Sequence, residues 1–201
     1  MKKQVILAVP SGGTMRTEMV SSLITSLYDL SDKGYNPNLI FQIGGYVAIN
    51  RNNLVKEAIA NKGTHIMFLD TDMIFPKDAI RQLMDQNKDI IAGNYNVRLG
   101  PLAKERSGTT VRFWDTKTKR AVVPLELPDE TFKCYTAATG FMLINLKVFK
   151  KIAYPWFVSY QKDDGEHYTE DVDFCIKAQA AGIDVWCDPT ISIGHIGQAV
   201  Y

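Results

Sequence analysis

Short, mostly apolar runs alternate with stretches of helical spacing along the first half of the chain. The runs 4–9 and 65–69 lack a regular polar alternation and end in turn residues, which predicts buried strands, and the run 39–43 predicts a further strand. Between them, 17–30 and 53–60 carry apolar residues on one side at helical spacing. Strand, helix, strand, helix, strand is a βαβαβ unit, so we expect parallel strands joined by right-handed crossovers.

The second half continues with further strands and helices. A helix ended by Gly182 precedes a final strand, and turn residues separate the other elements. The pattern predicts an α/β fold with a mostly parallel central sheet. The predicted elements are a helix over 77–87, a strand over 89–93, a hairpin of 110–114 and 121–123, a strand over 134–144, a short helix over 146–152, a helix over 170–181 and a strand over 183–187.

Composition narrows the class of protein. The 201 residues suffice for one sizeable core, which predicts a single domain, 1–201. The net charge of +1 argues against broad nucleic-acid binding, which needs a basic surface. Three cysteines without a C-x-x-C pair suggest neither a disulfide framework nor a zinc site, so we expect a cytoplasmic protein. We expect no membrane span, and the apolar run at the N-terminus is too short for a signal peptide.

Two acids, Asp70 and Asp72, directly follow the buried run 66–69. They therefore lie at the carboxyl end of a strand, where open α/β sheets bind ligands. Two neighbouring carboxylates repel each other unless a cation accompanies them, and a divalent metal that also holds phosphate oxygens meets that need. The alternative is that both acids cap the turn before a helix opened by Pro76 and Asp78.

The glycine-rich turn after the first strand, 10–13, lacks the spacing of a P-loop and of a dinucleotide-binding fingerprint. A basic segment, 96–120, forms either a solvated edge hairpin or a basic flap near phosphates or an acceptor. The basic residues of this segment are Arg98, Lys104, Arg106, Arg112, Lys117, Lys119 and Arg120.

Further candidates each allow a structural and a functional interpretation. Glu170 and Asp171 open a helix, where acids are favoured by the helix dipole, but they can also serve catalysis. A lone His195 is usually structural, yet glycines on both sides suit a ligand that approaches the backbone closely. Gly140 also allows close approach. Trp156 either packs in the core or offers a flat surface to a sugar ring.

Taken together, these segments resemble the GT-A nucleotide-sugar glycosyltransferases. The likeness lies in their order, their approximate spacing and their places at strand ends, and it covers nearly the whole chain. The matching segments are Asn50-Arg51-Asn52 before a helix, the D-x-D stretch His65–Asp72, the acceptor-side strand Thr139–Met142, the x-E-D motif Thr169–Cys175 with the following 181–186, and the late Gly194-His195.

The resemblance implies a GT-A-like Rossmann-type sandwich with a nucleotide-binding half, 1–93, and an acceptor-side half, 94–201. It implies transfer of a sugar from a nucleotide diphosphate donor, a UDP-sugar, to an unidentified acceptor hydroxyl by a hexosyltransferase-type enzyme. A metal held by Asp72 and His195, with Asp70 nearby, would stabilise the leaving phosphate. Imidazole in the ligand set favours Mn²⁺ over Mg²⁺.

The resemblance also implies the roles of individual residues. Asp171 would take the acceptor proton, which predicts inversion of configuration, and Glu170 would orient the acceptor. Asp70 could also reach the donor ribose, and Arg51 would lie near the base or diphosphate. Residues expected to bind the donor are Pro10, Ser11, Gln42, Ile43, Arg51, Asp70, Thr71, Gly140 and Trp156.

Two alternatives remain open at this point. One is a phosphatase of the haloacid-dehalogenase type with Asp70 and Asp72 as nucleophile and acid, although that motif normally follows the first strand rather than the third. The other is a nucleotide-sugar-binding module without catalysis. The acceptor, whether glycan, protein or small molecule, and the oligomeric state stay open.

Overall fold

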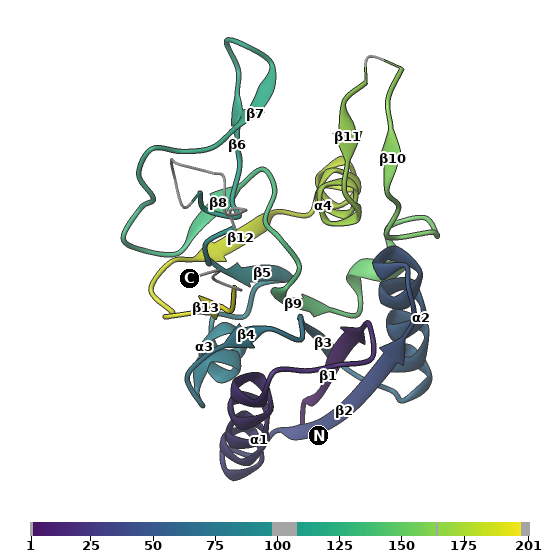
Figure 1. The fold of residues 1–201 in the computed structure, drawn as a ribbon, viewed down its shortest axis with the longest axis vertical. Helices are drawn as coiled ribbons and strands as arrows, with labels where there is room; N and C mark the ends of the chain where they lie inside the picture. The colour runs from purple at the N-terminus through teal and green to yellow at the C-terminus, as the bar shows by residue number, and fades with distance from the viewer. Residues whose placement is uncertain (1, 98–107, 164, 198–201) are drawn as a thin grey trace.

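A seven-stranded sheet runs through the part of the chain that the computed structural model describes, which is residues 2–97, 108–163 and 165–197 (Figure 1). The basic residues Arg98, Lys104 and Arg106 lie outside this described part. In sheet order the strands are β2 (Asn36–Ile43), β1 (Gln4–Ser11), β3 (His65–Leu69), β9 (Phe141–Asn145), β5 (Ile90–Gly93), β12 (Val185–Asp188) and β8 (Phe132–Cys134).

The sheet is mostly parallel, as the sequence predicts. β1 pairs in parallel with β2 and with β3, and β12 pairs in parallel with β5. β9 lies between β3 and β5 and runs antiparallel to both, and β8 runs antiparallel to β12 at the edge. The predicted halves 1–93 and 94–201 thus contribute strands to the same sheet, and their donor and acceptor roles stay a prediction.

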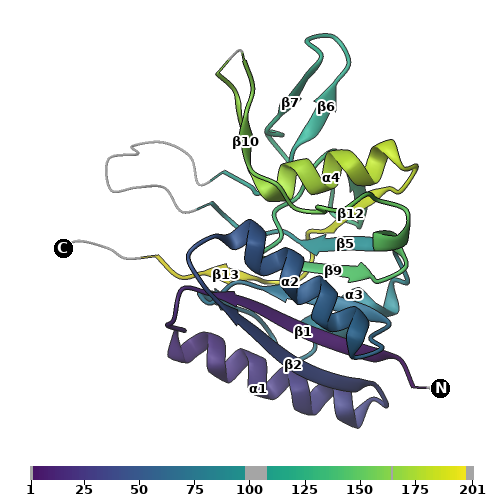
Figure 2. The same ribbon diagram turned by 90° about the vertical axis from the view of Figure 1, so that its right-hand side faces the viewer.

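Helices cover both faces of the sheet, because the central strands are apolar on both sides. α1 (Thr17–Asp32) and α3 (Ala79–Asp85) lie on one face, and α2 (Val47–Ala60) and α4 (Glu170–Ala180) lie on the other (Figures 1 and 2). Along β1, Val5, Leu7 and Val9 pack in the core with α1, whereas Ile6 and Ala8 pack in the core with α2. The prediction of buried strands is confirmed for β1 and β3.

Short elements decorate the edges of this sandwich. β6 (Phe113–Asp115) and β7 (Arg120–Val122) form the hairpin that the sequence predicts, and β10 (Tyr160–Gln161) and β11 (His167–Tyr168) form another. Both hairpins project on the same side, beyond α4 (Figures 1 and 2). β4 (Met73–Ile74) pairs with β13 (Gly194–His195), and η1 (Val148–Lys150) is a single 3-10 turn where a short helix was expected.

Two predicted elements differ from the structure. The run 134–144 was expected as one strand, but Cys134 ends β8 and the apolar residues from Phe141 form β9. The predicted helix over 53–60 begins earlier, at Val47, so the Asn50-Arg51-Asn52 segment lies inside α2 rather than before it. The start was missed because Tyr46 at the N-cap makes no side-chain hydrogen bond and gives no capping signal.

Candidate active site at the carboxyl edge of the sheet

A cavity of about 280 Å³ lies where β1, β2 and β3 end. The loop after β1 is tied to the D-x-D segment, because the Arg16 amide donates to the carbonyl of Thr71 at 3.0 Å. The side-chain amide of Asn50 donates to the Gly44 carbonyl at 3.2 Å and so fixes the loop after β2. The residues that line the cavity are Pro10, Ser11, Gly12, Gly44, Gly45, Val47, Asn50, Asp70, Thr71 and Asp72.

The structure therefore brings together Pro10, Ser11, Asp70 and Thr71, four of the residues expected to bind the donor. Gln42 and Ile43 do not line this cavity, because the chain reaches it only after β2, at Gly44 and Gly45. The Gln42 amide lies 3.5 Å from a carboxylate oxygen of Glu57, and the Ile43 side chain is exposed.

Asp72 and His195 face each other although they come from distant parts of the sequence. The pairing of β13 with β4 sets His195 opposite Met73, and its Nε2 lies 3.5 Å from Asp72 Oδ1. The other ring nitrogen, Nδ1, lies 3.1 Å from the carbonyl oxygen of Asn96. Since a carbonyl only accepts, Nδ1 carries the proton, and this contact orients the ring with Nε2 toward Asp72.

A carboxylate and an imidazole with its second nitrogen held by a carbonyl form a donor pair that suits a divalent cation. Within residues 2–97, 108–163 and 165–197, no group of three or more His, Cys, Asp or Glu side chains is assembled for a metal. Asp70 contributes to another contact, with Arg51. The residues thus fit a cation that takes two protein ligands and completes its shell with oxygens of a bound phosphate, as Mg²⁺ and related ions do in nucleotide sites.

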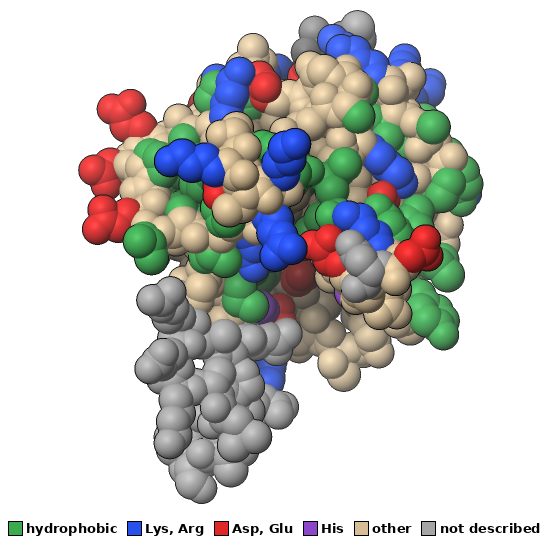
Figure 3. All heavy atoms as spheres, turned by 90° about the horizontal axis from the view of Figure 1, so that it is seen from above, with side chains coloured by type: hydrophobic (Ala, Val, Ile, Leu, Met, Phe, Trp, Pro, Cys, Tyr) green, Lys and Arg blue, Asp and Glu red, His purple; other side chains and the backbone are tan. Residues whose placement is uncertain are grey.

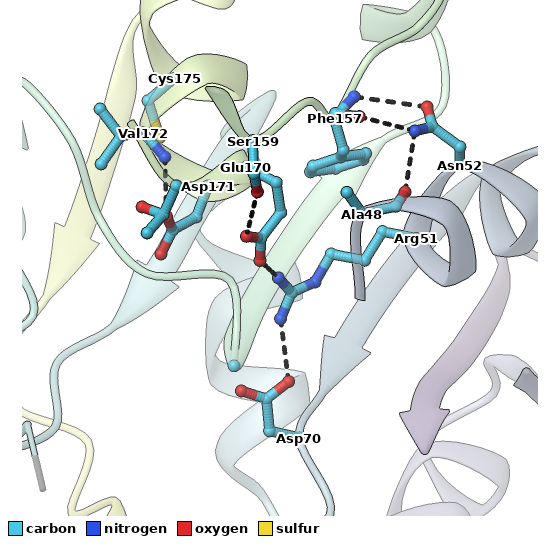
Figure 4. Close-up of polar contacts among 12 residues, drawn as sticks. Ala48, Arg51, Asn52, Asp70, Phe157, Ser159, Glu170, Asp171, Val172 and Cys175 are labelled. Carbon is cyan, nitrogen blue, oxygen red and sulfur yellow. Dashed lines mark hydrogen bonds and ion pairs between the residues drawn. The ribbon is translucent and has the colours of Figure 1, made fainter. Parts of the chain in front are cut away.

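Arg51 connects the D-x-D segment to the E-D motif. Its guanidinium donates to Asp70 Oδ1 at 2.9 Å through one terminal nitrogen and to Glu170 Oε1 through the other (Figure 4). Arg51 and Glu170 are 119 positions apart in the sequence. The Arg51 side chain is only 4 % exposed and that of Glu170 only 10 %, so their ion pair is buried.

This Arg51 bridge (Asp70–Arg51–Glu170) changes two expected roles. Arg51 is buried inside α2 and holds two carboxylates, instead of lying against the base or diphosphate of a nucleotide. Glu170 also accepts a hydrogen bond from the Ser159 hydroxyl at 3.3 Å, so both of its oxygens are engaged by the protein. Glu170 therefore positions Arg51, and the expected role of orienting the acceptor is not supported by these contacts.

Asp171, the next residue, is partly exposed at the start of α4. Its Oδ1 accepts from the amide of Val172 at 2.8 Å (Figure 4) and from the hydroxyl of Thr169. These local contacts orient the carboxylate and are typical of a helix N-terminus. They leave Oδ2 with no hydrogen bond among those found in the described part of the chain.

The neighbouring asparagine, Asn52, anchors α2 to the backbone of Trp156 and Phe157. The Asn52 side chain donates to the carbonyls of Ala48 and Phe157 (Figure 4). It also accepts from the backbone amide of Trp156. The Trp156 indole N–H in turn donates to the carbonyls of Phe149 and Ile152. Trp156 is buried in the core, which corrects its expected role as a surface for a sugar and bears out the alternative of core packing.

Tyr95 is a site residue that the sequence did not reveal. Its hydroxyl accepts from the Gly140 amide at 3.1 Å, and its ring meets the ring of His195 edge-on with centroids 5.3 Å apart. Burial, and then the charge of Asp70, raise the pKa of Tyr95, which keeps the phenol neutral. The only signal in the sequence is its place just beyond the carboxyl end of β5.

Gly140 allows the close approach expected of it, but the groups that approach belong to the protein. The amide of Asp70 donates to the Gly140 carbonyl at 3.0 Å, and a Cβ atom on Gly140 would lie 2.6 Å from Asp70 Oδ2 and closer still to the Tyr95 hydroxyl. The absence of a side chain here lets β9 start directly against the D-x-D segment.

No family model matches the chain, and no curated protein matches it. The solved structures that share its architecture include the following two. A197 from STIV aligns with a TM-score of 0.63 at 17 % identity, over 97 % of this chain and 86 % of that one. A mutant of Drosophila beta-1,4-galactosyltransferase 7, in complex with manganese, UDP-Gal and xylobiose, aligns with a TM-score of 0.52 at 15 % identity, over 98 % of this chain and 71 % of that one. At such identities the likeness shows the fold, which is α/β and GT-A-like.

The described residues contain no helix that is long and apolar enough to cross a membrane.

Proposed function

We propose that the chain is a metal-dependent glycosyltransferase that uses a nucleoside diphosphate sugar, a UDP-sugar, as donor. The observation that carries this proposal is the Asp72–His195 pair beside the cavity at the ends of β1 to β3. A diphosphate in that cavity would bring its oxygens close to Asp72 and His195. The diphosphate and the Asp72 carboxylate are both negatively charged and need a cation between them. The GT-A-like fold and the complex of one structural neighbour with manganese and UDP-Gal support the same class of donor.

In this proposal Asp72 and His195 hold the cation, and Mn²⁺ is favoured over Mg²⁺ because one ligand is an imidazole. The cation would neutralise charge on the departing diphosphate. Pro10, Ser11 and Thr71 line the nucleotide cavity. Asp70 is positioned by Arg51 and would contact the donor with the oxygen that Arg51 leaves free.

Asp171 is the proposed general base. An acceptor hydroxyl oxygen forms the new bond to the anomeric carbon, the bond from that carbon to the diphosphate breaks, and the hydroxyl proton passes to Asp171. Its Oδ1 is held by Thr169 and by the Val172 amide, so the proton would go to Oδ2. Direct attack of this kind inverts the configuration, and such a base contributes about 10²–10⁴-fold in rate.

The phosphatase alternative is not favoured. Asp70 would have to be its nucleophile, yet Asp70 Oδ1 is paired with Arg51 at 2.9 Å. A non-catalytic module differs from the proposed enzyme in one measurable respect, which is turnover of the donor.

The test is release of UDP from UDP-galactose, UDP-glucose and UDP-N-acetylglucosamine with Mn²⁺. We expect slow metal-dependent hydrolysis of at least one donor by the wild-type chain. Asp171→Asn should still bind UDP with Mn²⁺ but lose about 10²-fold or more in acceptor-dependent transfer once an acceptor is supplied. Asp32→Asn, at the exposed end of α1, is the matched control and should behave as wild type. Binding of a donor with no turnover would contradict the enzyme, and unchanged transfer by Asp171→Asn would move the base elsewhere.

A further inference from the structure

A groove of about 1,070 Å³ lies between the two hairpins, with the start of α4 as part of its wall. It is lined by residues of β6, β7, β10 and β11 and by Thr169, whose hydroxyl contacts Asp171. Figure 3, which looks onto the side that carries the hairpins, shows Lys and Arg side chains gathered around a hollow. The groove therefore opens next to the proposed base, Asp171.

The charge of this hairpin groove (the cavity between β6–β7 and β10–β11) is strongly positive. Four cationic side chains line it, against one acidic side chain, Glu166, so a neutral ligand would leave most of this charge uncompensated. Lys162 is tied to Glu166 and to the Tyr168 hydroxyl, and Arg112 donates to the carbonyls of Thr109 and Val111. The cationic residues of the groove are Arg112, Lys119, Arg120 and Lys162.

Lys119 and Arg120 differ from the other two cations. No ion pair of either residue with an acidic residue is found in the described ranges, and both side chains are exposed, Lys119 at the turn of the β6–β7 hairpin and Arg120 at the start of β7, opposite Asp115. The turn itself is fixed, because Asp115 accepts from the Lys117 amide at 2.9 Å and from the Thr118 hydroxyl at 2.6 Å. These two cations are consequently available to an anionic ligand.

The backbone at Lys119 is left-handed, as it also is at Lys62 and Asn87. The φ of Lys119 is 53°, a left-handed conformation in which glycine is free of strain and lysine is not. The Lys119 side chain places a cation at the rim of the groove.

The groove also offers an aromatic surface suited to a ring. Trp114 is 45 % exposed and lies against Tyr135 with ring centroids 4.8 Å apart. Tyr168 is covered by Lys162 on its face and is stacked with Tyr160, so it has little free surface. The open indole of Trp114 suits stacking of a sugar ring. Tyr160, which also lines the groove, is 40 % exposed.

We infer that the hairpin groove binds an acidic saccharide, a sugar chain that carries carboxylate or sulfate groups, as the acceptor. Trp114 stacks on a sugar ring, and Lys119 and Arg120 pair with its anionic groups. That the bound saccharide is the acceptor rests on the proposed function, but binding of the saccharide in the groove does not depend on the donor.

The test measures binding by titration calorimetry without donor or metal. The probes are tetragalacturonate for carboxylate groups, a chondroitin sulfate hexasaccharide for sulfate groups, neutral maltohexaose, and a ten-nucleotide oligothymidylate. We expect at least one of the acidic saccharides to bind at least tenfold more tightly than maltohexaose and than the oligonucleotide. The affinity should fall with added salt, since exposed charges are screened. Equal affinity for neutral and acidic saccharides, or tighter binding of the oligonucleotide, would overturn the inference.

Variants distinguish binding in the hairpin groove from a general effect of positive charge on the surface. Lys119→Ala/Arg120→Ala and Trp114→Ala should each weaken binding of the acidic saccharide at least tenfold. Lys150→Ala/Lys151→Ala removes the same charge at η1 and should change the affinity less than twofold. Lys119→Gly should weaken binding while the melting temperature stays unchanged or rises, because glycine accepts the left-handed backbone. Unchanged affinity in the double variant at residues 119 and 120 would refute the site.

UDP binding with Mn²⁺, measured in parallel, distinguishes the two proposals. If the acidic saccharide binds but UDP does not, the groove stands and the proposed donor chemistry fails. If UDP binds but no acidic saccharide does, the donor chemistry stands and the inferred acceptor is wrong.

Discussion

Replacement of Arg51 by methionine should lower the free energy of unfolding by about 3–5 kcal/mol, the usual result of removing one partner from a buried ion pair. The loss has unequal sources. Glu170 is 10 % exposed and would be left charged with only the Ser159 hydroxyl as a partner, whereas Asp70 is 34 % exposed and can be hydrated. Most of the cost should therefore come from Glu170.

Double-mutant cycles test how the loss of stability is divided between Glu170 and Asp70. Adding Glu170→Gln to Arg51→Met should restore part of the stability, with a coupling energy of about 1–3 kcal/mol. Adding Asp70→Asn should restore less than about 1 kcal/mol, because that carboxylate is screened by solvent. The matched control is Lys133→Met, which breaks an exposed pair with Asp184 and should cost no more than about 1 kcal/mol.

The assay is urea unfolding followed by circular dichroism. The slope of the unfolding free energy against urea concentration should be the same in all variants, so that the comparison reports stability alone. For a chain of this size a loss of 3–5 kcal/mol corresponds to a fall in melting temperature of roughly 6–20 °C. A loss below 1 kcal/mol for Arg51→Met, or a coupling with Asp70 larger than that with Glu170, would refute the reasoning.

Two further changes probe packing and protonation. Gly140→Ala should lower the free energy of unfolding by about 1–3 kcal/mol, because its Cβ overpacks against Asp70 and Tyr95, and it should impair UDP binding. Gly108→Ala, whose Cβ would meet no atom within 4 Å, should be tolerated in both measurements. Wild-type behaviour of Gly140→Ala would contradict this and would show that β9 can shift. Burial lowers the pKa of His65 to about 4. Below about pH 6.5 this histidine is therefore protonated in the unfolded chain but stays neutral in the folded chain until about pH 4. Stability should thus fall by about 2–3 kcal/mol between pH 6.5 and pH 4, a component that His65→Asn should lack in parallel unfolding curves, and identical pH profiles would contradict it.

The sequence predicted the framework of the fold because buried parallel strands are contiguous apolar runs. The same property hid the direction of β9, since a strand that is apolar on both faces reads alike in either direction. The start of α2 was missed for lack of a capping residue, and Arg51 was therefore placed before the helix and not within it.

The site was predictable where a motif follows a strand, as at Asp70 and Asp72. It was not predictable where a contact depends on topology. The pair of Arg51 with Glu170 joins α2 to α4 on one face of the sheet, and no local sequence pattern predicts it. Tyr95 has no motif, and its place beside His195 follows from the return of the chain through β13 to β4.

The central claim is that Asp72 and His195 hold a cation beneath a nucleoside diphosphate. The direct measurement is titration calorimetry of UDP in the presence of Mn²⁺ and in the presence of a chelator, with the wild-type chain, Asp72→Asn, His195→Ala and the control Asp32→Asn. We predict that the wild-type chain and the control bind UDP only with Mn²⁺ and that the two site variants bind at least tenfold more weakly. UDP binding that is equally tight in Asp72→Asn and His195→Ala, or that is indifferent to the chelator, would contradict the claim.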